Sequence, residues 1–282
     1  MAKNIFTEAR FHDEAAAREW FEAARWPHGP ICSHCGYDKH YPTKITGRYR
    51  CANPDCRKDF TVQTGTVMER SHAPLTQWAV AFTMGCASKK GFSAHQLHRQ
   101  LGCQYKTAWF LHHRVMEAMR EGGLDLPPMG GEGQIVEADE TYYGPMEQPQ
   151  TSERRRKDGR PYTKSGTNGP ANKRAIVSLV ERGGRVRSFH VPRADKATVS
   201  RIVADNIAHE SRLHTDESKL YTFVGQMFGS HETVCHSAKE YARGDVHCNS
   251  AEGYFSIFKR GMRGVYQHCS EKHLHRYLAE FD

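Results

Sequence analysis

Acidic side chains at three separate places in the chain could together hold divalent metal. Asp139 closes a short apolar run, residues 135–138, that is typical of a buried strand. A second apolar stretch ends in Asp216, and a helix-like segment from Asn249 carries Glu252. Hard cations take oxygen ligands, and two of them about 4 Å apart can stabilise both the attacking and the leaving oxygen of a phosphoryl transfer. The three acids are therefore predicted to bind Mg²⁺ or Mn²⁺ for chemistry on phosphate esters.

The helix predicted over residues 249–263 would present its polar side chains along one face. At about 100° per residue these are Asn249, Glu252, Ser256, Lys259 and Arg263. The apolar face would pack on a sheet and consists of Ala251, Phe255, Phe258 and Met262. Solvent alone explains many such polar faces, and an aspartate such as Asp139 can also cap a turn. The combination with two strand-end aspartates favours a site in which Lys259 contacts a DNA phosphate.

Glu140 and Glu217 directly follow the two aspartates. Because successive side chains of a strand point to opposite faces, both glutamates are expected to face away from the metal. The sequence contains no GxxxxGK[ST] loop, so the chemistry is expected to need no ATP.

Four cysteines have the spacing of a tetrahedral zinc site. Cys32-x2-Cys35 and Cys51-x4-Cys56 form two close pairs, and tetrahedral zinc takes four thiolates from two such short segments. Four unrelated reduced cysteines are the alternative. The total of nine cysteines is odd and four of them cluster, which favours metal over disulfides. We therefore predict a zinc ribbon with a structural role, since four thiolates leave no ligand position open.

Three helices are predicted over residues 75–89, 93–101 and 105–120. Ser93 and Gln96 form a capping-box pattern at the start of the second helix, and Gly102 is typical of its end. Two helices joined by a short turn with glycine match a helix-turn-helix, and a plain three-helix packing module is the alternative. The side chains expected to face DNA are Gln104, Lys106, Thr107, His113 and Arg114.

A polar, basic insert over residues 145–172 follows the strand that carries Asp139. It contains Arg154, Arg155 and Arg156. The insert is predicted to be a mobile loop, either a solvated charge run or an arm that binds phosphates. Its position directly after the strand with the first acid favours DNA contact.

Composition agrees with a polyanionic partner. The formal net charge is +8 before eighteen histidines are counted, and a basic surface suits nucleic acid. The hydrophobic fraction of 38% argues against disorder. The first ten residues lack the apolar core of a signal peptide, and no run approaches the ~18 apolar residues of a membrane helix. We expect a cytoplasmic, nucleoid-associated protein with no membrane partner.

The order of predicted elements after residue 129 indicates an α/β ribonuclease-H-like domain. Strands over 175–180 and 186–191 form a hairpin, and a helix over 195–209 precedes the strand that delivers Asp216. A helix over 218–228 and a strand over 231–235 follow. The expected domains are 1–70, an amino-terminal helix and zinc ribbon; 71–128, a helix-turn-helix; and 129–282, the ribonuclease-H-like catalytic domain with the basic insert.

Several motifs together resemble a known family. They are Arg25–Gly29 before the cysteines, Asp139–Gly144, Thr215–Glu217, and, most specifically, His247–Gly253 with Lys259-Arg260, Gly264–Tyr266 and Lys272–Leu274. Over nearly its whole length the chain resembles the zinc-ribbon-containing DDE transposases of bacterial insertion sequences, relatives of the Merlin elements.

The resemblance implies an Mg²⁺-dependent polynucleotidyl transferase that cuts element ends and joins the freed 3′-hydroxyl to target DNA. Asp139 and Asp216 would be its first two acids. Glu252 stands seven residues before Lys259, which looks like the Glu-x6-Lys signature. Relatives with an asparagine in the third role leave Asn249 as the alternative ligand. The implied partners are terminal inverted repeats and target DNA, bound by a homodimer or higher oligomer.

Two other functions remain open at this stage. The first is a DNA-binding regulator in which the ribonuclease-H-like domain is inactive, and the second is a structure-selective nuclease of the same fold. The chain stops at residue 282, where relatives usually continue with a short basic tail, which leaves open whether this copy is truncated.

Overall fold

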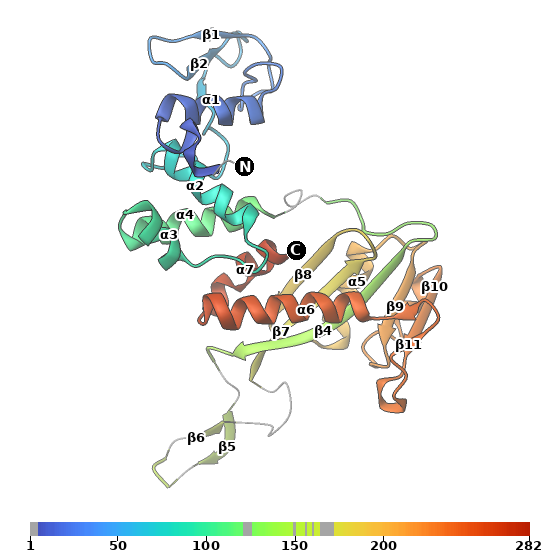
Figure 1. Ribbon diagram of the computed structural model, residues 1–282. Coiled ribbons are helices and arrows are strands. Elements are labelled where there is room, and N and C mark those ends of the chain that lie inside the picture. Colours follow the sequence, from blue (N-terminus) through green and yellow to red (C-terminus); the bar gives the residue numbers. More distant parts are fainter. Residues whose placement is uncertain (1–4, 121–125, 149–150, 156, 160, 164–171) are drawn as a thin grey trace. The chain divides into compact units, whose positions relative to one another are not determined.

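The computed structural model describes residues 5–120, 126–148, 151–155, 157–159, 161–163 and 172–282. The chain forms two compact units, residues 1–118 and 119–282, coloured from blue to green and from green to red in Figure 1. No helix within these described ranges is long and apolar enough to cross a membrane.

The amino-terminal unit begins with a helix joined to a small sheet by aromatic side chains. α1 (Glu14–Arg25) is capped by Asp13, whose carboxylate accepts hydrogen bonds from amides of the first turn. The ring of Trp26, just after α1, lies edge-on to the rings of Tyr49 and Phe60. The antiparallel sheet has the order β1 (His40–Pro42), β2 (Arg48–Cys51), β3 (Asp59–Thr61). Two short turns, η1 (Ile5–Thr7) and η2 (Ala9–Phe11), precede α1.

Three helices complete this unit, and their prediction is confirmed. They are α2 (Leu75–Ala87), α3 (Ala94–Leu101) and α4 (Tyr105–Ala118). The hydroxyl of Ser93 accepts from the amide of Gln96 at 3.1 Å, which caps α3. Gly102 ends α3 in the left-handed conformation, with φ of 60°. Trp78, Leu97 and Leu111 are fully buried.

The carboxyl-terminal unit is built on a five-stranded sheet with the order β10-β9-β4-β7-β8. Its strands are β4 (Ile135–Pro145), β7 (Lys173–Glu181), β8 (Val186–Val191), β9 (Arg212–Asp216) and β10 (Ser230–Val234). β4, β7 and β8 form an antiparallel meander. β9 pairs with the other edge of β4 in parallel, and β10 pairs with β9 in parallel. Three consecutive strands followed by alternating elements is the arrangement that the sequence predicts.

Each face of the sheet packs against a helix, as Figure 1 shows for α6 (Asn249–Gly261) in front and α5 (Lys196–Asn206) behind. Side chains of β7 alternate between these faces. Val177 and Leu179 belong to the core that contains α5, whereas Val180 packs with Ala251 and Phe255 of α6. β4, beside β7 in the centre of the sheet, therefore also presents alternate residues to α6.

The remaining described elements are short. β5 (Thr151–Arg155) pairs with β6 (Pro161–Thr163), so the predicted loop over 145–172 contains a strand pair. The others are the hairpin β11 (Ala242–Arg243) and β12 (Val246–His247), the short 3-10 helices η3 (Val224–Met227), η4 (His236–Ala238) and η6 (Glu271–His273), the π-helix η5 (Met262–Tyr266) that follows α6, and α7 (Leu274–Phe281).

The helix predicted over 218–228 is wrong, because only η3 is helical there. Tyr221 is fully buried and donates its hydroxyl hydrogen to Glu140 at 2.7 Å. Gly225 lies so close to His231 that a Cβ atom would stand 2.0 Å from the imidazole ring. These two contacts hold the backbone in an irregular path beneath the sheet.

Candidate active site and zinc site

Asp139 lies inside β4 and not at its end, so that part of the prediction is wrong. The reason is that β7 pairs with β4 as far as Pro145. On the other side, β9 pairs only with residues 135–137 of β4. Continuing this parallel register by two residues places Asp139 level with Asp216, the last residue of β9. Residues in register on parallel strands share a face, so the two carboxylates emerge together where β9 leaves the sheet.

α6 runs along this same face of β4. Tyr143, four residues after Asp139 and therefore on its side of the strand, contacts Phe258 with ring centroids 5.6 Å apart. The predicted apolar face of the helix is confirmed, since Ala251, Phe255, Phe258 and Met262 are all buried. Glu252 and Lys259, seven residues apart, therefore share a different face of α6, beside the two aspartates.

The neighbouring acids act electrostatically on Asp139. The pKa of Asp139 is raised to about 8, first by burial of its carboxyl group and next by the negative charges of Asp216, Glu140 and Glu252. Burial and Arg263 lower the pKa of Lys259, and the charge of Asp139 opposes that shift. β4, β9 and α6 thus place Asp216, Glu252 and Lys259 within electrostatic range of Asp139.

Glu140 forms its hydrogen bond on the face opposite α6, as expected, whereas Glu217 is bonded to the residue that follows His236. Glu140 accepts from the hydroxyl of Tyr221 on the α5 side of the sheet. Burial raises its pKa, and the charge of Asp216 adds to that effect. Glu217 accepts from the amide of Ser237 at 3.1 Å.

Asn249 and Glu252 differ in their relation to the aspartates. Asn249 is exposed at the start of α6, where its backbone amide donates to His247. Glu252, in contrast, contributes to the raised pKa of Asp139. The sequence analysis also missed His236, whose Nε2 lies 3.9 Å from a carboxylate oxygen of Glu252. No signal in the sequence distinguishes His236 from the other seventeen histidines.

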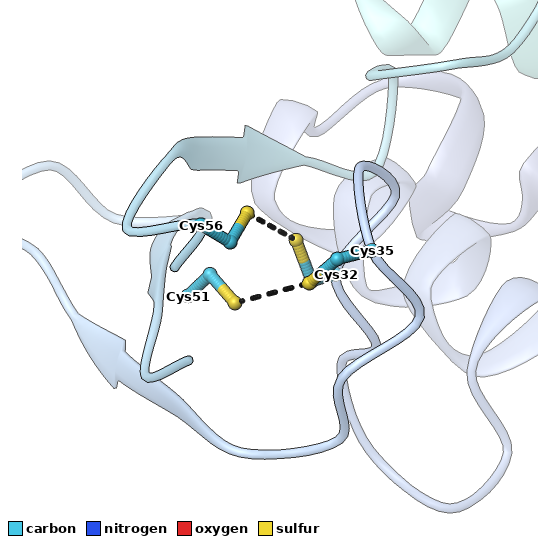
Figure 2. A group of neighbouring side chains, drawn as sticks. All are labelled: Cys32, Cys35, Cys51 and Cys56. Atoms are coloured by element: carbon cyan, nitrogen blue, oxygen red, sulfur yellow. Dashed lines mark hydrogen bonds between the residues drawn. The ribbon is translucent and has the colours of Figure 1, made fainter. Parts of the chain in front are cut away.

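The four predicted zinc ligands converge in the amino-terminal unit. Their sulfur atoms all lie within 4.8 Å of one another (Figure 2), with Cys32 and Cys56 at 3.8 Å and Cys35 and Cys51 at 3.5 Å. Zn–S bonds of about 2.3 Å require a tetrahedron with edges of about 3.8 Å. Four thiolates in this arrangement fit zinc. Within the described part of the chain, this is the only group of three or more potential ligands that closes to that distance.

The side chains predicted to face DNA from α4 divide into two sets. Lys106 is exposed and Thr107 is half-buried near the start of the helix. His113 is buried, with 2% exposure, and its ring lies 4.0 Å from that of Trp109. The expectation that His113 faces DNA is therefore corrected, because α4 turns this side chain inward. The guanidinium of Arg114 donates to the carbonyls of Val67 and Glu69 at 2.5 and 2.7 Å, which ties α4 to the segment between β3 and α2.

The basic residues of the insert are only partly within the described structure. Arg154 and Arg155 belong to β5, and Arg156 lies outside the described residues. Their predicted contact with DNA stays a prediction.

Comparisons with known proteins agree with this division into a zinc-binding unit and an acid-bearing unit. Residues 130–282 match the family model of the ISXO2-like transposase domain, and residues 12–59 match that of the transposase zinc-ribbon domain. The first match covers more than half of the chain. The chain belongs to the ISXO2-like transposase family, which confirms the resemblance seen in its motifs.

One curated relative and one solved structure illustrate the likeness. The chain is similar to an uncharacterized protein in transposable element ISH50 of Halobacterium salinarum, with 31% identity over 96% of this chain and 90% of the relative. It is also similar to a chain in the crystal structure of a pre-cleavage Mos1 transpososome, with 12% identity over 72% of this chain and 74% of that one. The TM-score of 0.24 for the second comparison is too low to support an argument about the fold.

Proposed function

We propose that this transposase binds the terminal inverted repeats of its insertion sequence, cleaves the element ends, and joins the 3′-hydroxyls to target DNA. One observation carries the proposal: Asp216, level with Asp139 on the neighbouring strand, and Glu252, on α6, both raise the pKa of Asp139, so acids from two strands and a helix gather around one buried carboxyl group. A protein retains such a cluster when a cation offsets it.

The donor set suits Mg²⁺ or Mn²⁺. Carboxylate oxygens are the ligands that these hard cations prefer. Asp139, Asp216 and Glu252 would hold the metal, and Asn249 is the alternative to Glu252. Bound there, two cations supply Lewis-acid stabilisation of the attacking and leaving oxygens of an in-line displacement. Lys259, on the same face of α6 as Glu252, would bind a phosphate of the cleaved strand.

The fold that holds these groups is proposed to be ribonuclease-H-like. Support comes from the strand order, in which the meander of β8, β7 and β4 is followed by β9 and β10 in parallel. DNA ends would be bound by the amino-terminal unit, with α3 and α4 as a helix-turn-helix. Lys106 and Thr107 at the start of α4 are the proposed contacts, joined by Arg154, Arg155 and Arg156 of the insert.

A cleavage assay tests the proposal. Purified protein with Mg²⁺ should nick duplex DNA that carries the inverted repeats of the element, and it should leave a duplex with scrambled repeats intact. Asp139→Asn is the matched control for contaminating nucleases. Binding without cleavage by the parent would favour a DNA-binding regulator instead, and equal cleavage of both duplexes would favour a structure-selective nuclease. Sizing the complex on DNA would show whether it contains a homodimer or a higher oligomer.

A further inference from the structure

The start of α6 is held by a side chain of another element. The first amides of a helix lack partners within the helix and are usually capped by the residue before it. Cys248 occupies that position and makes no capping hydrogen bond through its side chain. Glu137 of β4 replaces it: its carboxylate accepts from the amides of Ser250 and Ala251 at 2.8 and 3.1 Å.

Glu137 is fully buried, is paired with Arg182, and lies 3.3 Å from Nδ1 of His247. The Nε of Arg182 donates to its carboxylate at 2.6 Å, and the hydroxyl of Ser250 donates at 3.0 Å. A carboxylate at a helix N-terminus also interacts favourably with the helix dipole. Four donors therefore satisfy this one carboxylate, which makes its position well determined.

Arg182 binds the segment that precedes Cys248. Its guanidinium donates to the carbonyls of Asp245 and His247 at 2.5 and 2.9 Å. Glu137 and Arg182 thus fix both the segment that enters α6 and the first turn of the helix itself. We name these two side chains the α6 clamp.

Arg182 contacts a side chain two residues before each aspartate. Glu137 precedes Asp139 on the same face of β4. His214 precedes Asp216 in the same way on β9, and its Nδ1 lies 3.3 Å from a guanidinium nitrogen of Arg182. Arg182 therefore contacts the residue two positions before each aspartate, and through Glu137 it reaches the turn of α6 that bears Glu252.

We propose that the α6 clamp, Glu137 with Arg182, is a positioning device that sets the distance of Glu252 from Asp139 and Asp216. In this role Glu137 acts through the amides of Ser250 and Ala251, which donate to its carboxylate. Without it, the first turn of α6 would lose two of its amide partners, and Glu252 would move relative to the strands. The role deepens the proposed function and rests on it for its catalytic consequence only.

The test uses Glu137→Ala and the isosteric Glu137→Gln in the full-length chain. Glu181→Gln is the matched control, because Glu181 also faces an arginine, at 3.7 Å, and lies outside α6. Amide hydrogen exchange should accelerate at residues 249–253 in Glu137→Ala and, less strongly, in Glu137→Gln. Amides of β4 and β7 should exchange as in the parent, and Glu181→Gln should leave α6 unchanged.

Cleavage supplies the second readout. A misplaced Glu252 should reduce the cleavage rate by roughly 10- to 100-fold, and it should raise the Mg²⁺ concentration required for half-maximal rate, while binding of the DNA ends stays at the parent level. Unchanged exchange at residues 249–253, parent-like cleavage by Glu137→Ala, or failure of Glu137→Gln to fold would each overturn the clamp. If the parent itself does not cleave, the proposed function fails, and the exchange result still decides whether Glu137 holds α6.

Discussion

Two properties of Asp139 disfavour the charged form of its carboxyl group. It is largely buried, and its neighbours Asp216, Glu140 and Glu252 are acidic, so its pKa is raised to about 8. Burial without compensation favours the neutral form of an acid. A divalent cation would reverse this preference, because its charge stabilises the carboxylate form. The property that makes the group costly in the free protein is thus what suits it to bind metal.

Amide substitutions test the three acids individually. Asp139→Asn and Asp216→Asn should each reduce Mg²⁺-dependent cleavage by roughly 100-fold or more, equivalent to about 2.7 kcal/mol in the barrier. Glu252→Gln should do the same, and Asn249→Ala should cost less, because a neutral amide contributes only a dipole. Rates are measured on inverted-repeat duplexes, with circular dichroism as the control for folding. An inactive Asn249→Ala beside an active Glu252→Gln would transfer the third role to Asn249.

Glu280 gives a prediction about pH that is independent of the metal site. Its pKa is raised to about 7 by burial, which outweighs the hydrogen bond donated by Tyr266. An unfolded glutamate titrates near 4.3, so between about pH 4 and 7 the unfolded chain releases a proton that the folded chain keeps. The contribution of Glu280 to the free energy of unfolding should therefore be fully present at low pH. It should decline as pH rises through this window, by about 1.4 kcal/mol per unit of pKa difference at most.

Glu280→Gln should remove that decline. In urea unfolding, the free energy of unfolding of the variant minus that of the parent should be larger at pH 8 than at pH 5. Glu132→Gln, at an exposed glutamate, is the control. A stability difference between Glu280→Gln and the parent that does not change with pH would show that Glu280 titrates normally.

At the scale of elements, periodicity predicted what depends on local sequence. α2, α3 and α4 begin and end within about two residues of their predicted bounds, and β8 occupies its predicted range. The predictions that were wrong concern segments whose structure depends on contacts with residues distant in sequence. The segment 218–228 is irregular because of Glu140 and His231, and β4 is long because β7 pairs with it.

The candidate site follows the same division. Asp139, Asp216, Glu252 and Lys259 could be predicted because their motifs are local and their spacing is characteristic. Glu137 and Arg182 could not, since one lies in an apolar strand and the other in a hairpin, 45 residues apart. Only the sheet register brings them to the start of α6.

The helices of the amino-terminal unit allow DNA contact to be separated from folding. Lys106→Ala should weaken binding to inverted-repeat DNA and reduce the dependence of log K on log salt by about one, because an exposed lysine neutralises one phosphate. Arg114→Ala should instead lower the melting temperature of this unit, because the carbonyls of Val67 and Glu69 lose their donor. Titrations at several salt concentrations and thermal melts distinguish the two. Equal affinity of Lys106→Ala and the parent would exclude the start of α4 as the contact.

At the scale of the whole molecule, the zinc site and the proposed site for divalent cations belong to different units. The four cysteines lie within residues 1–118, and the three acids lie within 119–282. Inside the first unit, the zinc ribbon and the three helices are connected. Glu14 of α1 accepts from the amides of Leu75 and Thr76 at the start of α2, at 2.8 and 3.2 Å. Loss of zinc should therefore reach the helices proposed to bind DNA.

This arrangement predicts that zinc removal abolishes the proposed binding of element ends without unfolding residues 119–282. Structural zinc contributes roughly 10 kcal/mol or more to a small domain, so Cys32→Ser or Cys56→Ser should lose the one zinc expected per chain. Calorimetry should then lack the transition of residues 1–118 and keep that of residues 119–282. Cys86→Ser, at an exposed cysteine outside the cluster, should retain zinc, both transitions and DNA binding. Simultaneous loss of both transitions would show that the two units unfold together. Full zinc retention in Cys32→Ser and Cys56→Ser would show that these cysteines do not bind the zinc.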